Sequence, residues 1–573
     1  MKEKKSKQIV FKSLSSSWAS ILLVIITLVL TSLLSLVSPI IYKVLIDDVI
    51  PNKDQKRLVI YLILMIAIPW LITLIASIKN YFSTKIGESI SSLLRIECFD
   101  KALHAQQEAF EKITPPQILN RITRECGRIG EIYVTKDLVT FVSEIISLIA
   151  TLITMLIFNI PLTCVCIIAF PVSFILTKYV SKKNKTLDSE LFACLEKGNK
   201  FLNEVLNKIK TIKLKNAYTF EAENWKTWID SYRRIKIKTT ITHSINGFLL
   251  GNFIINIIYG IMFFISGLLV INGNMTIGTL VSFVAFVPKV YSSLKNVLNI
   301  KITTNVIDNA FDVIDEILEL PQENRMGSKF DEINSVGFDR VSFKYNRNDF
   351  GIENMSFNIK KGRTVGIVGK SGGGKTTIFD LLTGLYYPQN GIVSINDDDT
   401  CSADVNSLRN RISVVTQNID LFDGNIKDNI LFNCNECRSN LDDLLEIVSL
   451  KDFIMQLPDG IRTEVGYNGE LLSGGERQRI AIANALIKDS DVILLDEFTS
   501  ALDLETERKV MNYIFSLKDK IIIIISHRIY ALMNCDEIYV ISDGKIIEHG
   551  KPMELSKNEK SHFTKMLNDL NYS

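Results

Sequence analysis

The chain has 573 residues, of which 47% are hydrophobic and 22% charged, so it is too long for one ordinary domain and more apolar than a typical soluble protein. Its 65 Lys and Arg nearly balance its 63 Asp and Glu, and the formal net charge of +2 excludes an overall basic excess that would attract nucleic acid. We therefore expect more than one domain, part of the chain in lipid, and no nucleic-acid partner.

The first 320 residues contain charge-poor apolar runs that are long enough to cross a bilayer as helices. We expect six spans, at about residues 17–42, 58–79, 138–158, 161–181, 242–271 and 276–300. Breaks at Asn159-Ile160-Pro161 and Asn272-Gly273-Asn274 separate the third span from the fourth and the fifth from the sixth. Residues 1–320 are thus predicted to form a transmembrane domain.

The distribution of Lys and Arg predicts the orientation of these spans. The start of the chain is basic, and so are the two long connections, residues 79–136 and 178–238. An even number of spans puts both termini on one side, which we expect to be the cytosol, and the first apolar run is too long for a cleavable signal peptide. The sequence predicts a multi-pass protein of a cell membrane, of bacterial type.

The two long connections keep an apolar, helix-like periodicity, so the membrane helices are expected to continue into the cytosol. Each connection turns over a short polar segment, around residues 112–116 and 218–222.

A few polar side chains lie within the predicted spans: Glu144 in the third, Asn252 and Asn256 on one face of the fifth, and Lys289 in the sixth. An intramembrane carboxylate usually faces a cavity or a partner, so these residues predict a cavity for an amphipathic cargo such as a peptide, a drug or a lipid. Hydrogen bonds between helices, without cargo contact, account for the same pattern equally well.

The nine cysteines are scattered, and no disulfide framework is expected. Cys434 and Cys437 form a single CxxC pair with no nearby second pair or histidine. Two ordinary thiols in a reducing cytosol are favoured over a zinc site or a redox pair.

Beyond a linker at residues 321–335, short β-rich runs alternate with helical stretches, and residues 336–573 are predicted to form an α/β domain. The buried run 364–368 is followed by Gly369-Lys370-Ser371-Gly372-Gly373-Gly374-Lys375-Thr376-Thr377 and then by a helical pattern. This is a complete GxxxxGK[ST] phosphate loop in a strand–loop–helix context. Backbone N–H groups would surround phosphates, Lys375 would add a positive charge, and Thr376 would offer its hydroxyl to Mg²⁺.

A second apolar run, residues 492–495, ends in Asp496-Glu497. In such folds an acid at this strand end lies beside the phosphate loop. Asp496 is therefore predicted to reach the Mg²⁺ shell, and Glu497 to polarise the attacking water.

The segment Leu472-Ser473-Gly474-Gly475-Glu476-Arg477-Gln478-Arg479 resembles the signature sequence of the ATP-binding cassette (ABC) ATPases. The remaining motifs of that family follow in order: Tyr345 matches the aromatic that stacks on adenine, Gln417 the Gln loop, Ser500 to Asp503 the D-loop, and His527 the switch histidine. Taken singly, each has an ordinary structural explanation, but the full ordered set does not.

The resemblance implies a membrane all-α six-helix domain followed by an α/β P-loop NTPase domain, in an exporter-type half-transporter. It implies ATP and Mg²⁺ as cofactors, with Thr376, Gln417 and Asp496 at the metal and Glu497, His527 and Gln417 catalytic. It also implies a dimer with a second copy, or with a similar half-transporter, in which Ser473, Gly474 and Gly475 of one chain face the ATP of the other.

ATP binding and hydrolysis would then move cargo outward by alternating access, with the connections near Pro115 and Phe220 against the ATPase surface. A lipid flippase, and an ATP-gated regulator or channel on the same scaffold, remain alternatives. Three residues depart from the family pattern: Tyr467, Asn484 and Phe498.

The total charge is near neutral because the opposite net charges of the two parts of the chain cancel. Residues 1–320 hold 36 Lys and Arg against 25 Asp and Glu, whereas the remainder holds 29 against 38. A basic membrane domain suits anionic lipid, and an acidic ATPase domain suits basic loops.

Overall fold

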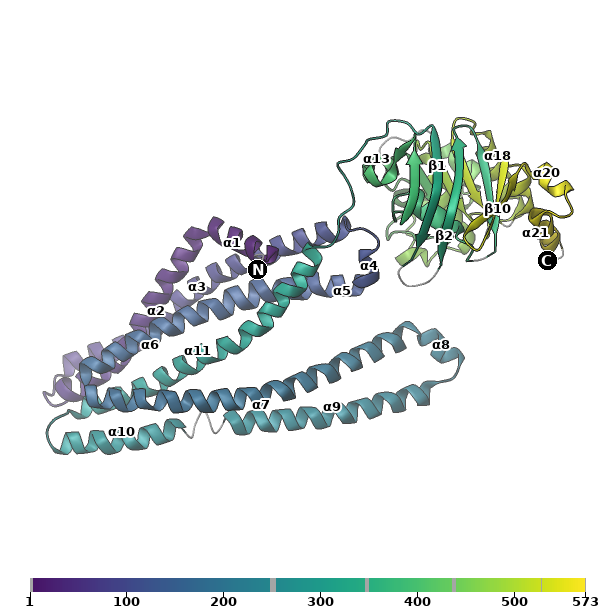
Figure 1. Cartoon of the computed structure of the whole chain (residues 1–573). Coiled ribbons are helices and arrows are strands. Elements are labelled where there is room, and N and C mark those ends of the chain that lie inside the picture. The colour runs from purple at the N-terminus through teal and green to yellow at the C-terminus, as the bar shows by residue number, and fades with distance from the viewer. Residues whose placement is uncertain are drawn as a thin grey trace. The chain divides into compact units, whose positions relative to one another are not determined.

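The computed structural model describes residues 4–247, 254–345, 350–370, 372–434, 440–526 and 528–571. The chain divides into two compact units: one is Met1–Leu103 with Pro116–Glu319, and the other is His104–Pro115 with Leu320–Ser573. Figure 1 shows that the first is helical and that the second contains the sheets. A helical membrane region followed by an α/β domain is confirmed as the fold class.

The helical unit consists of a few very long helices joined by short turns (Figure 1). In chain order the helices before residue 320 are α1 (Lys5–Ser16), α2 (Trp18–Val44), α3 (Gln55–Leu103), α4 (Ala109–Lys112), α5 (Pro115–Asn120), α6 (Val139–Phe158), α7 (Ile160–Asn207), α8 (Ile209–Leu214), α9 (Tyr218–Gly247), α10 (Ile254–Ile271) and α11 (Ile277–Leu318). Wider π-helical turns occur at Leu45–Val49, Arg121–Glu125 and Arg128–Leu138. The longest, α3, has 49 residues, more than twice the length that a bilayer core requires.

Within the described residues, four segments are long and apolar enough to cross a membrane: Trp18–Val49, Gln55–Leu103, Pro115–Phe158 and Ile277–Val297. A shorter apolar helix covers Asn256–Ile271. The expected fifth span, residues 242–271, falls partly on residues 248–253, which lie outside the described part of the chain.

Side-chain caps fix the turns between the membrane helices. Asn159 precedes α7 and accepts a hydrogen bond from the Leu162 N–H, while Pro161 occupies the first helical turn. Thr276 caps α11, and its hydroxyl donates to Asp47 Oδ2 at 2.6 Å. These polar contacts replace the backbone partners that helix ends lack.

An aromatic stack joins α7 to α9. Trp225, Trp228 and Tyr232 recur on α9, with ring centroids 4.5 and 5.4 Å apart, and Phe201 of α7 stacks on Trp225 at 5.9 Å. Trp228 covers Gly198, where a Cβ would lie 2.2 Å from the indole ring. The two helices therefore pack as a hairpin through contacts that a larger residue at 198 would prevent.

Two sheets build the α/β unit. Its strands are β1 (Ser335–Lys344), β2 (Gly351–Lys360), β3 (Thr364–Gly369), β4 (Asn390–Ile395), β5 (Asp398–Asp399), β6 (Ile412–Val415), β7 (Val492–Asp496), β8 (Ile521–Ile525), β9 (Glu537–Ser542) and β10 (Lys545–Gly550). One antiparallel sheet has the order β2-β1-β4-β5, and the other has the order β10-β9-β3-β8-β7-β6. All pairs in the second sheet are parallel except β9 with β10, and every residue of β3, β7 and β8 is buried, as expected for strands covered on both faces.

Helices surround this second sheet and complete the unit. They are α12 (Lys375–Leu382), α13 (Val405–Asn410), α14 (Ile426–Ile430), α15 (Leu441–Ile447), α16 (Lys451–Gln456), α17 (Gly474–Ile487), α18 (Leu504–Ser516), α19 (Ile529–Met533), α20 (Pro552–Lys557) and α21 (His562–Asn571), with 3₁₀ turns at Thr400–Ser402, Gly460–Arg462 and Tyr467–Gly469.

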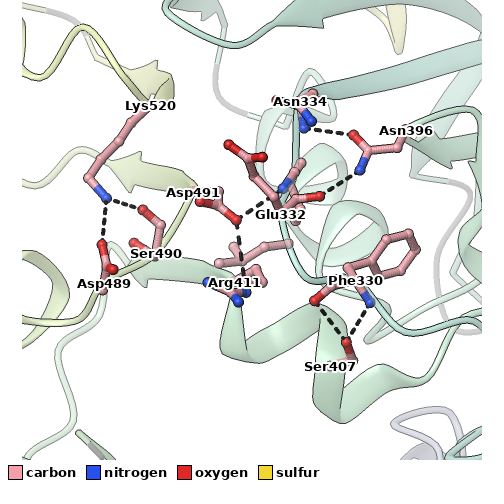
Figure 2. Close-up of polar contacts among 12 residues, drawn as sticks. Phe330, Glu332, Asn334, Asn396, Ser407, Arg411, Asp489, Ser490, Asp491 and Lys520 are labelled. Carbon is pink, nitrogen blue, oxygen red and sulfur yellow. Dashed lines mark hydrogen bonds and ion pairs between the residues drawn. The ribbon is translucent and has the colours of Figure 1, made fainter. Parts of the chain in front are cut away.

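The chain enters the α/β unit through residues 330–334, which polar contacts hold in place (Figure 2). The Phe330 N–H donates to Ser407 Oγ at 2.7 Å, and the Ile333 N–H donates to Asp491 Oδ2 at 3.0 Å. Asn396 accepts from the Asn334 N–H and donates to the Glu332 carbonyl, both at 2.6 Å. This end of the linker is therefore an ordered part of the α/β unit.

Candidate functional site

The phosphate loop connects β3 to α12. Gly372 and Gly374 adopt positive φ angles of 79° and 93°, and a Cβ at Gly374 would lie 2.8 Å from Ile352 Cγ2, so glycine is required there. Lys375 is 8% exposed, and its ammonium donates to the carbonyls of Gly369 (2.9 Å) and Lys370 (3.0 Å). Burial lowers the pKa of Lys375, because the charged ammonium is disfavoured away from water. A bound anion would have the opposite effect and favour the charged form. Ser371 lies outside the described residues.

Asp496 is the last residue of β7, and Glu497 follows it. In the sheet, the single strand β8 lies between β7 and β3. The Thr376 hydroxyl donates to Asp496 Oδ2 at 3.0 Å. Burial raises the pKa of Asp496, and this rise is partly opposed by the Thr376 hydrogen bond. A hydroxyl and a carboxylate separated by 120 positions thus meet directly across the sheet.

Glu497 has a left-handed backbone, with φ 45°, and its N–H donates to the Ile525 carbonyl at 2.9 Å. Left-handed conformations of non-glycine residues cost free energy and concentrate at functional sites. Gln417 Nε2 donates to Glu497 Oε2 at 2.8 Å. The contact orients the carboxylate.

Tyr345 lies at the other end of the same site. Its hydroxyl donates to Asp380 Oδ2 at 2.6 Å and to Thr377 Oγ1 at 3.3 Å, which connects the ring to α12. Burial and the Asp380 hydrogen bond raise the pKa of Tyr345, so it stays a neutral donor. Burial also raises the pKa of Asp380.

These groups line one cavity of about 280 Å³. Its lining comprises Tyr345, Phe350, Gly351, Gly372, Gly374, Lys375, Thr376, Thr377, Gln417, Asp496 and Glu497. Phosphate-loop amides, a buried ammonium, a hydroxyl–carboxylate pair and an aromatic ring suit a nucleoside triphosphate with a divalent cation.

The predicted signature residues do not line this cavity. Ser473 caps α17: its Oγ accepts from the Glu476 N–H at 3.3 Å, and its own N–H donates to Glu476 Oε2 at 2.7 Å, which makes a capping box. Gly474 follows directly and is exposed, and a Cβ at Gly475 would lie 2.9 Å from the Ala501 carbonyl. The start of α17 is thus an ordered helix N-terminus away from the described cavity of its own chain.

Asp503 caps α18 by accepting from the N–H groups of Glu505 (3.1 Å) and Thr506 (2.9 Å). These hydrogen bonds, that of Thr506 above all, lower the pKa of Asp503. Asp503 does not line the described cavity either, and His527 lies outside the described residues.

Sequence reasoning missed several residues at this site. Phe350 is 62% exposed, lines the cavity, and lies 3.6 Å from where a Gly372 Cβ would be. Gln478, 2% exposed, bonds Ser500 Oγ at 3.3 Å and accepts from the Ala501 N–H at 2.7 Å. Gln478 belongs to the signature segment, residues 472–479, so the sequence motif could have identified it as a site residue. No sequence motif includes Phe350.

Two of the three family departures have a structural explanation. Asn484 Nδ2 donates to the carbonyls of Asn429, Ile430 and Phe432 at 2.9–3.2 Å. The Asn484 side chain therefore caps carbonyl groups at the C-terminal end of α14. Phe498 is 1% exposed and belongs to the core. Nothing in the structure explains Tyr467, which is 79% exposed.

In the helical unit, the predicted cargo residues are only partly brought together. Glu144 Oε1 of α6 accepts from Asn296 Nδ2 of α11 at 2.7 Å, and the Lys289 ammonium of α11 donates to Ser35 Oγ of α2. These four residues form a polar cluster among α2, α6 and α11, which we call the membrane polar cluster. Asn256 is exposed on α10, and Asn252 lies outside the described residues.

Comparisons with known proteins agree with this geometry. The ABC transporter transmembrane region family matches residues 21–294, and the ABC transporter family matches residues 352–500, so the two together cover most of the chain. A protein described as an export ATP-binding/permease protein of Rickettsia typhi is 28% identical over 94% of this chain and 95% of its own length.

An ATP-dependent lipid A-core flippase of Methylococcus capsulatus is 29% identical, over 89% of this chain and 86% of its own length. Among solved structures, a bacterial Atm1-family ABC exporter with ATP bound has a TM-score of 0.84 at 22% identity, over 96% of this chain and 98% of that one. The last comparison shows a common fold.

Proposed function

The chain belongs to the ABC transporter family and couples ATP hydrolysis to export across a membrane, and on this basis we propose how its residues hydrolyse ATP and which cargo it moves. The observation that carries the proposal is a pair of hydrogen bonds, Thr376 to Asp496 and Gln417 to Glu497. They gather side chains from three separate segments around one cavity beside the phosphate loop.

In the proposed reaction the phosphates of ATP lie on the amides of residues 369–377, and the Lys375 ammonium exchanges its loop carbonyls for phosphate oxygens. Gln417 holds Glu497 Oε2, so that Oε1 accepts a hydrogen bond from the attacking water and orients it. His527 is proposed to hold the γ-phosphate, as the family resemblance implies.

The donors present fit Mg²⁺, because the Thr376 hydroxyl, the Gln417 amide oxygen and the Asp496 carboxylate are the oxygen ligands that this ion prefers. When bound, the ion would neutralise negative charge on the phosphates. The Thr376–Asp496 contact keeps two of these donors together.

We propose that two copies of the chain share two ATP sites. Ser473 and Gly474 are exposed at the N-terminus of α17 and do not line the cavity of their own chain, which supports their use by a partner. A helix N-terminus attracts anions, so the α17 of one copy would face the γ-phosphate held by the other. A homodimer is the simplest assembly, with both termini in the cytosol.

The cargo is proposed to be amphipathic and to carry an anionic group. Lys289 bonds a neutral hydroxyl, and within the described residues no carboxylate lies within ion-pair distance of it, although Glu144 is close enough to interact electrostatically. An ammonium among membrane helices is costly unless an anion or a cavity accompanies it. The lipid A-core flippases among the relatives favour a lipid over a peptide or a dye, and a flippase is therefore the second candidate description of the same activity.

The test of ATP hydrolysis uses the purified chain in lipid vesicles. Glu497→Gln should abolish phosphate release while preserving ATP binding, because the amide no longer accepts the water proton strongly. Unchanged hydrolysis by this variant would overturn the assignment of Glu497.

The test of cargo compares phosphate release with added anionic lipids, zwitterionic lipids, peptides and dyes. Stimulation by anionic amphiphiles that Lys289→Ala removes, and that Lys295→Ala on the exposed side of α11 retains, supports the cargo class. ATP-dependent ion conductance without stimulation by any amphiphile would instead support the channel alternative.

A further inference from the structure

Helix α3 lies beside residues 121–138, the helical segment that leads into α6 (Figure 1). The Ser83 hydroxyl donates to the Thr135 carbonyl at 3.1 Å. Further along α3, a Cβ at Gly87 would lie only 2.5 Å from the Gly130 carbonyl oxygen. Two glycines at the contact thus let the two backbones approach more closely than larger side chains would allow.

The same close packing continues to the end of α3 that we expect in the cytosol. A Cβ at Gly127 would lie 3.0 Å from Arg95 Nη2, so the guanidinium lies against the residue that follows Cys126. Cys98 comes three positions after Arg95, on the same side of α3. Cys98 and Cys126 are both 0% exposed, and their thiols are hydrogen-bond partners. Two free thiols from separate helices therefore meet inside the helical unit.

A disulfide needs close backbones as well as close sulfur atoms. Its Cβ atoms are typically about 3.5–4.5 Å apart, and a longer separation requires backbone movement. Gly130 lies against both Gly87 and Ser91 of α3. Because Gly130 is about one helical turn from Cys126, the backbones are already close beside the two thiols. Cys98 and Cys126 can therefore be linked with little movement of either helix.

We propose that Cys98 and Cys126 are an oxidation site, at which hydrogen peroxide joins the two thiols in a disulfide and staples α3 to residues 121–138. In the cytosol the pair is normally reduced, since disulfides there are usually transient and redox-sensing. Hydrogen peroxide is small and uncharged, so a brief local opening of the helix pair admits it to the buried thiols. Neither cysteine lines the nucleotide cavity, and the proposal does not depend on how ATP is hydrolysed.

The oxidation proceeds in two balanced steps. The Cys126 thiolate attacks one oxygen of the peroxide and the O–O bond breaks, which gives a Cys126 sulfenic acid and hydroxide; the hydroxide takes up the proton that the Cys126 thiol released. The Cys98 sulfur then attacks the sulfenic sulfur, so an S–S bond forms, the S–O bond breaks, and the hydroxyl leaves as water with the Cys98 proton. Two thiols thus lose two electrons and two protons, and one peroxide becomes two water molecules. The Arg95 guanidinium, which lies against Gly127, favours a thiolate at Cys126, so Cys126 reacts first.

The disulfide changes the stability of the helical unit. It closes a loop of residues 98–126 and restricts the unfolded chain, so it stabilises the folded helices. A thiol reductant breaks it again. The oxidised chain therefore resists heat better, and the reduced chain recovers the original stability.

The experiment uses the full chain in nanodiscs of phosphatidylethanolamine and phosphatidylglycerol, reduced with dithiothreitol, freed of the reductant and treated with hydrogen peroxide. Free thiols are then blocked with N-ethylmaleimide in denaturant, and digested peptides are analysed by mass spectrometry without reduction. Cys98→Ser and Cys126→Ser each remove one thiol of the pair. Cys434→Ser is the matched control, because it breaks the CxxC pair of the α/β unit. Oxidation of the exposed Cys401 shows that the peroxide reached the protein.

In the wild type and in Cys434→Ser, peroxide is expected to link Cys98 to Cys126 in most chains and to raise the midpoint of thermal unfolding of the helical unit by about 4 °C or more. Dithiothreitol should reverse both changes, and neither should occur in Cys98→Ser or Cys126→Ser. Tryptophan fluorescence reports this unfolding, because all four tryptophans precede residue 320: Trp18, Trp70, Trp225 and Trp228.

Three results in the wild type would each overturn the inference. The first is oxidised Cys401 in samples in which Cys98 and Cys126 both remain free thiols. The second is a linked peptide only in chains that run as a covalent dimer on a non-reducing gel, because the disulfide then joins two copies. The third is linkage within one chain that leaves the unfolding midpoint unchanged.

Discussion

The α/β unit and the helical unit hold their polar residues in different ways. In the α/β unit, the start of α12 and the end of β7 bring Thr376, Asp496 and Glu497 to one cavity, beside a sheet whose central strands are wholly buried. In the helical unit, the membrane polar cluster depends on the packing of separate helices, and residues such as Asn256 remain exposed in the single chain. The arrangement in the α/β unit suits a reaction on one ligand of constant shape. The arrangement in the helical unit suits cargo of variable shape.

The largest expected effect compares two glycines. Gly374→Ala forces alanine into a positive φ of 93° and brings its Cβ within 2.8 Å of Ile352, so ATP affinity should fall by roughly 10- to 100-fold, since such strain costs on the order of 1–3 kcal/mol. Gly267→Ala on α10 meets no atom within 4 Å and should leave ATP affinity unchanged. Titration with a fluorescent ATP analogue measures both. Equal losses would show that the two units are not independent in this respect.

The next comparison uses two amide–carboxylate hydrogen bonds of almost equal length. Gln417 bonds Glu497 at 2.8 Å, and Asn296 bonds Glu144 at 2.7 Å. Gln417→Ala should lower the kcat of ATP hydrolysis by about tenfold or more, because the general base loses its orientation. In Asn296→Ala, the rate of ATP hydrolysis measured in the absence of cargo should stay within about twofold of the wild-type rate. Only the stimulation of hydrolysis by amphiphiles should change. A large loss of unstimulated hydrolysis in Asn296→Ala would contradict the division of roles.

A smaller effect is expected from pH. Burial raises the pKa of Asp496, so its carboxylate is protonated, and ceases to accept from Thr376, at a higher pH than an ordinary Asp. ATP hydrolysis should therefore decline on the acid side above the usual titration range of Asp. Thr376→Ala removes a hydrogen bond that favours the charged form and should move this decline to still higher pH. The pH profile of kcat/KM for both proteins checks the direction, and a shift to lower pH in the variant would contradict it.

The smallest effect compares two helix caps. Asp503 caps α18 in the α/β unit, and Asn159 caps α7 in the helical unit, so Asp503→Ala and Asn159→Ala should each cost about 1 kcal/mol of free energy of unfolding. The folded-state pKa of Asp503 is lowered, so its stabilisation is present above the ordinary Asp pKa and is lost as pH falls through the lowered value. The Asn159 cap has no titratable group, because its side-chain amide accepts from the Leu162 N–H and donates to Met275 Sδ. Thermal unfolding of the two variants at neutral and acid pH distinguishes them, and equal pH dependence would contradict this account.

The identity of the ATPase domain was predictable because its signals are local in the sequence. The run from Gly369 to Thr377, and the acids after residue 495, each carry their structural context with them. In contrast, nothing in the sequence pairs Tyr386 with Glu111, because these residues are 275 positions apart and neither belongs to a phosphate-binding motif. The contact of Phe350 with the cavity likewise depends on how β2 enters its sheet.

The sequence by itself determined that apolar helices precede an α/β ATPase domain, because hydrophobic runs and glycine-rich turns are properties of neighbouring residues. Tertiary structure alone decided two things. It bonded Thr376 to Asp496 and Gln417 to Glu497, and it placed residues 104–115 in the α/β unit. The physical reason is that these contacts join segments that only the parallel sheet and the packing around it bring within hydrogen-bonding distance.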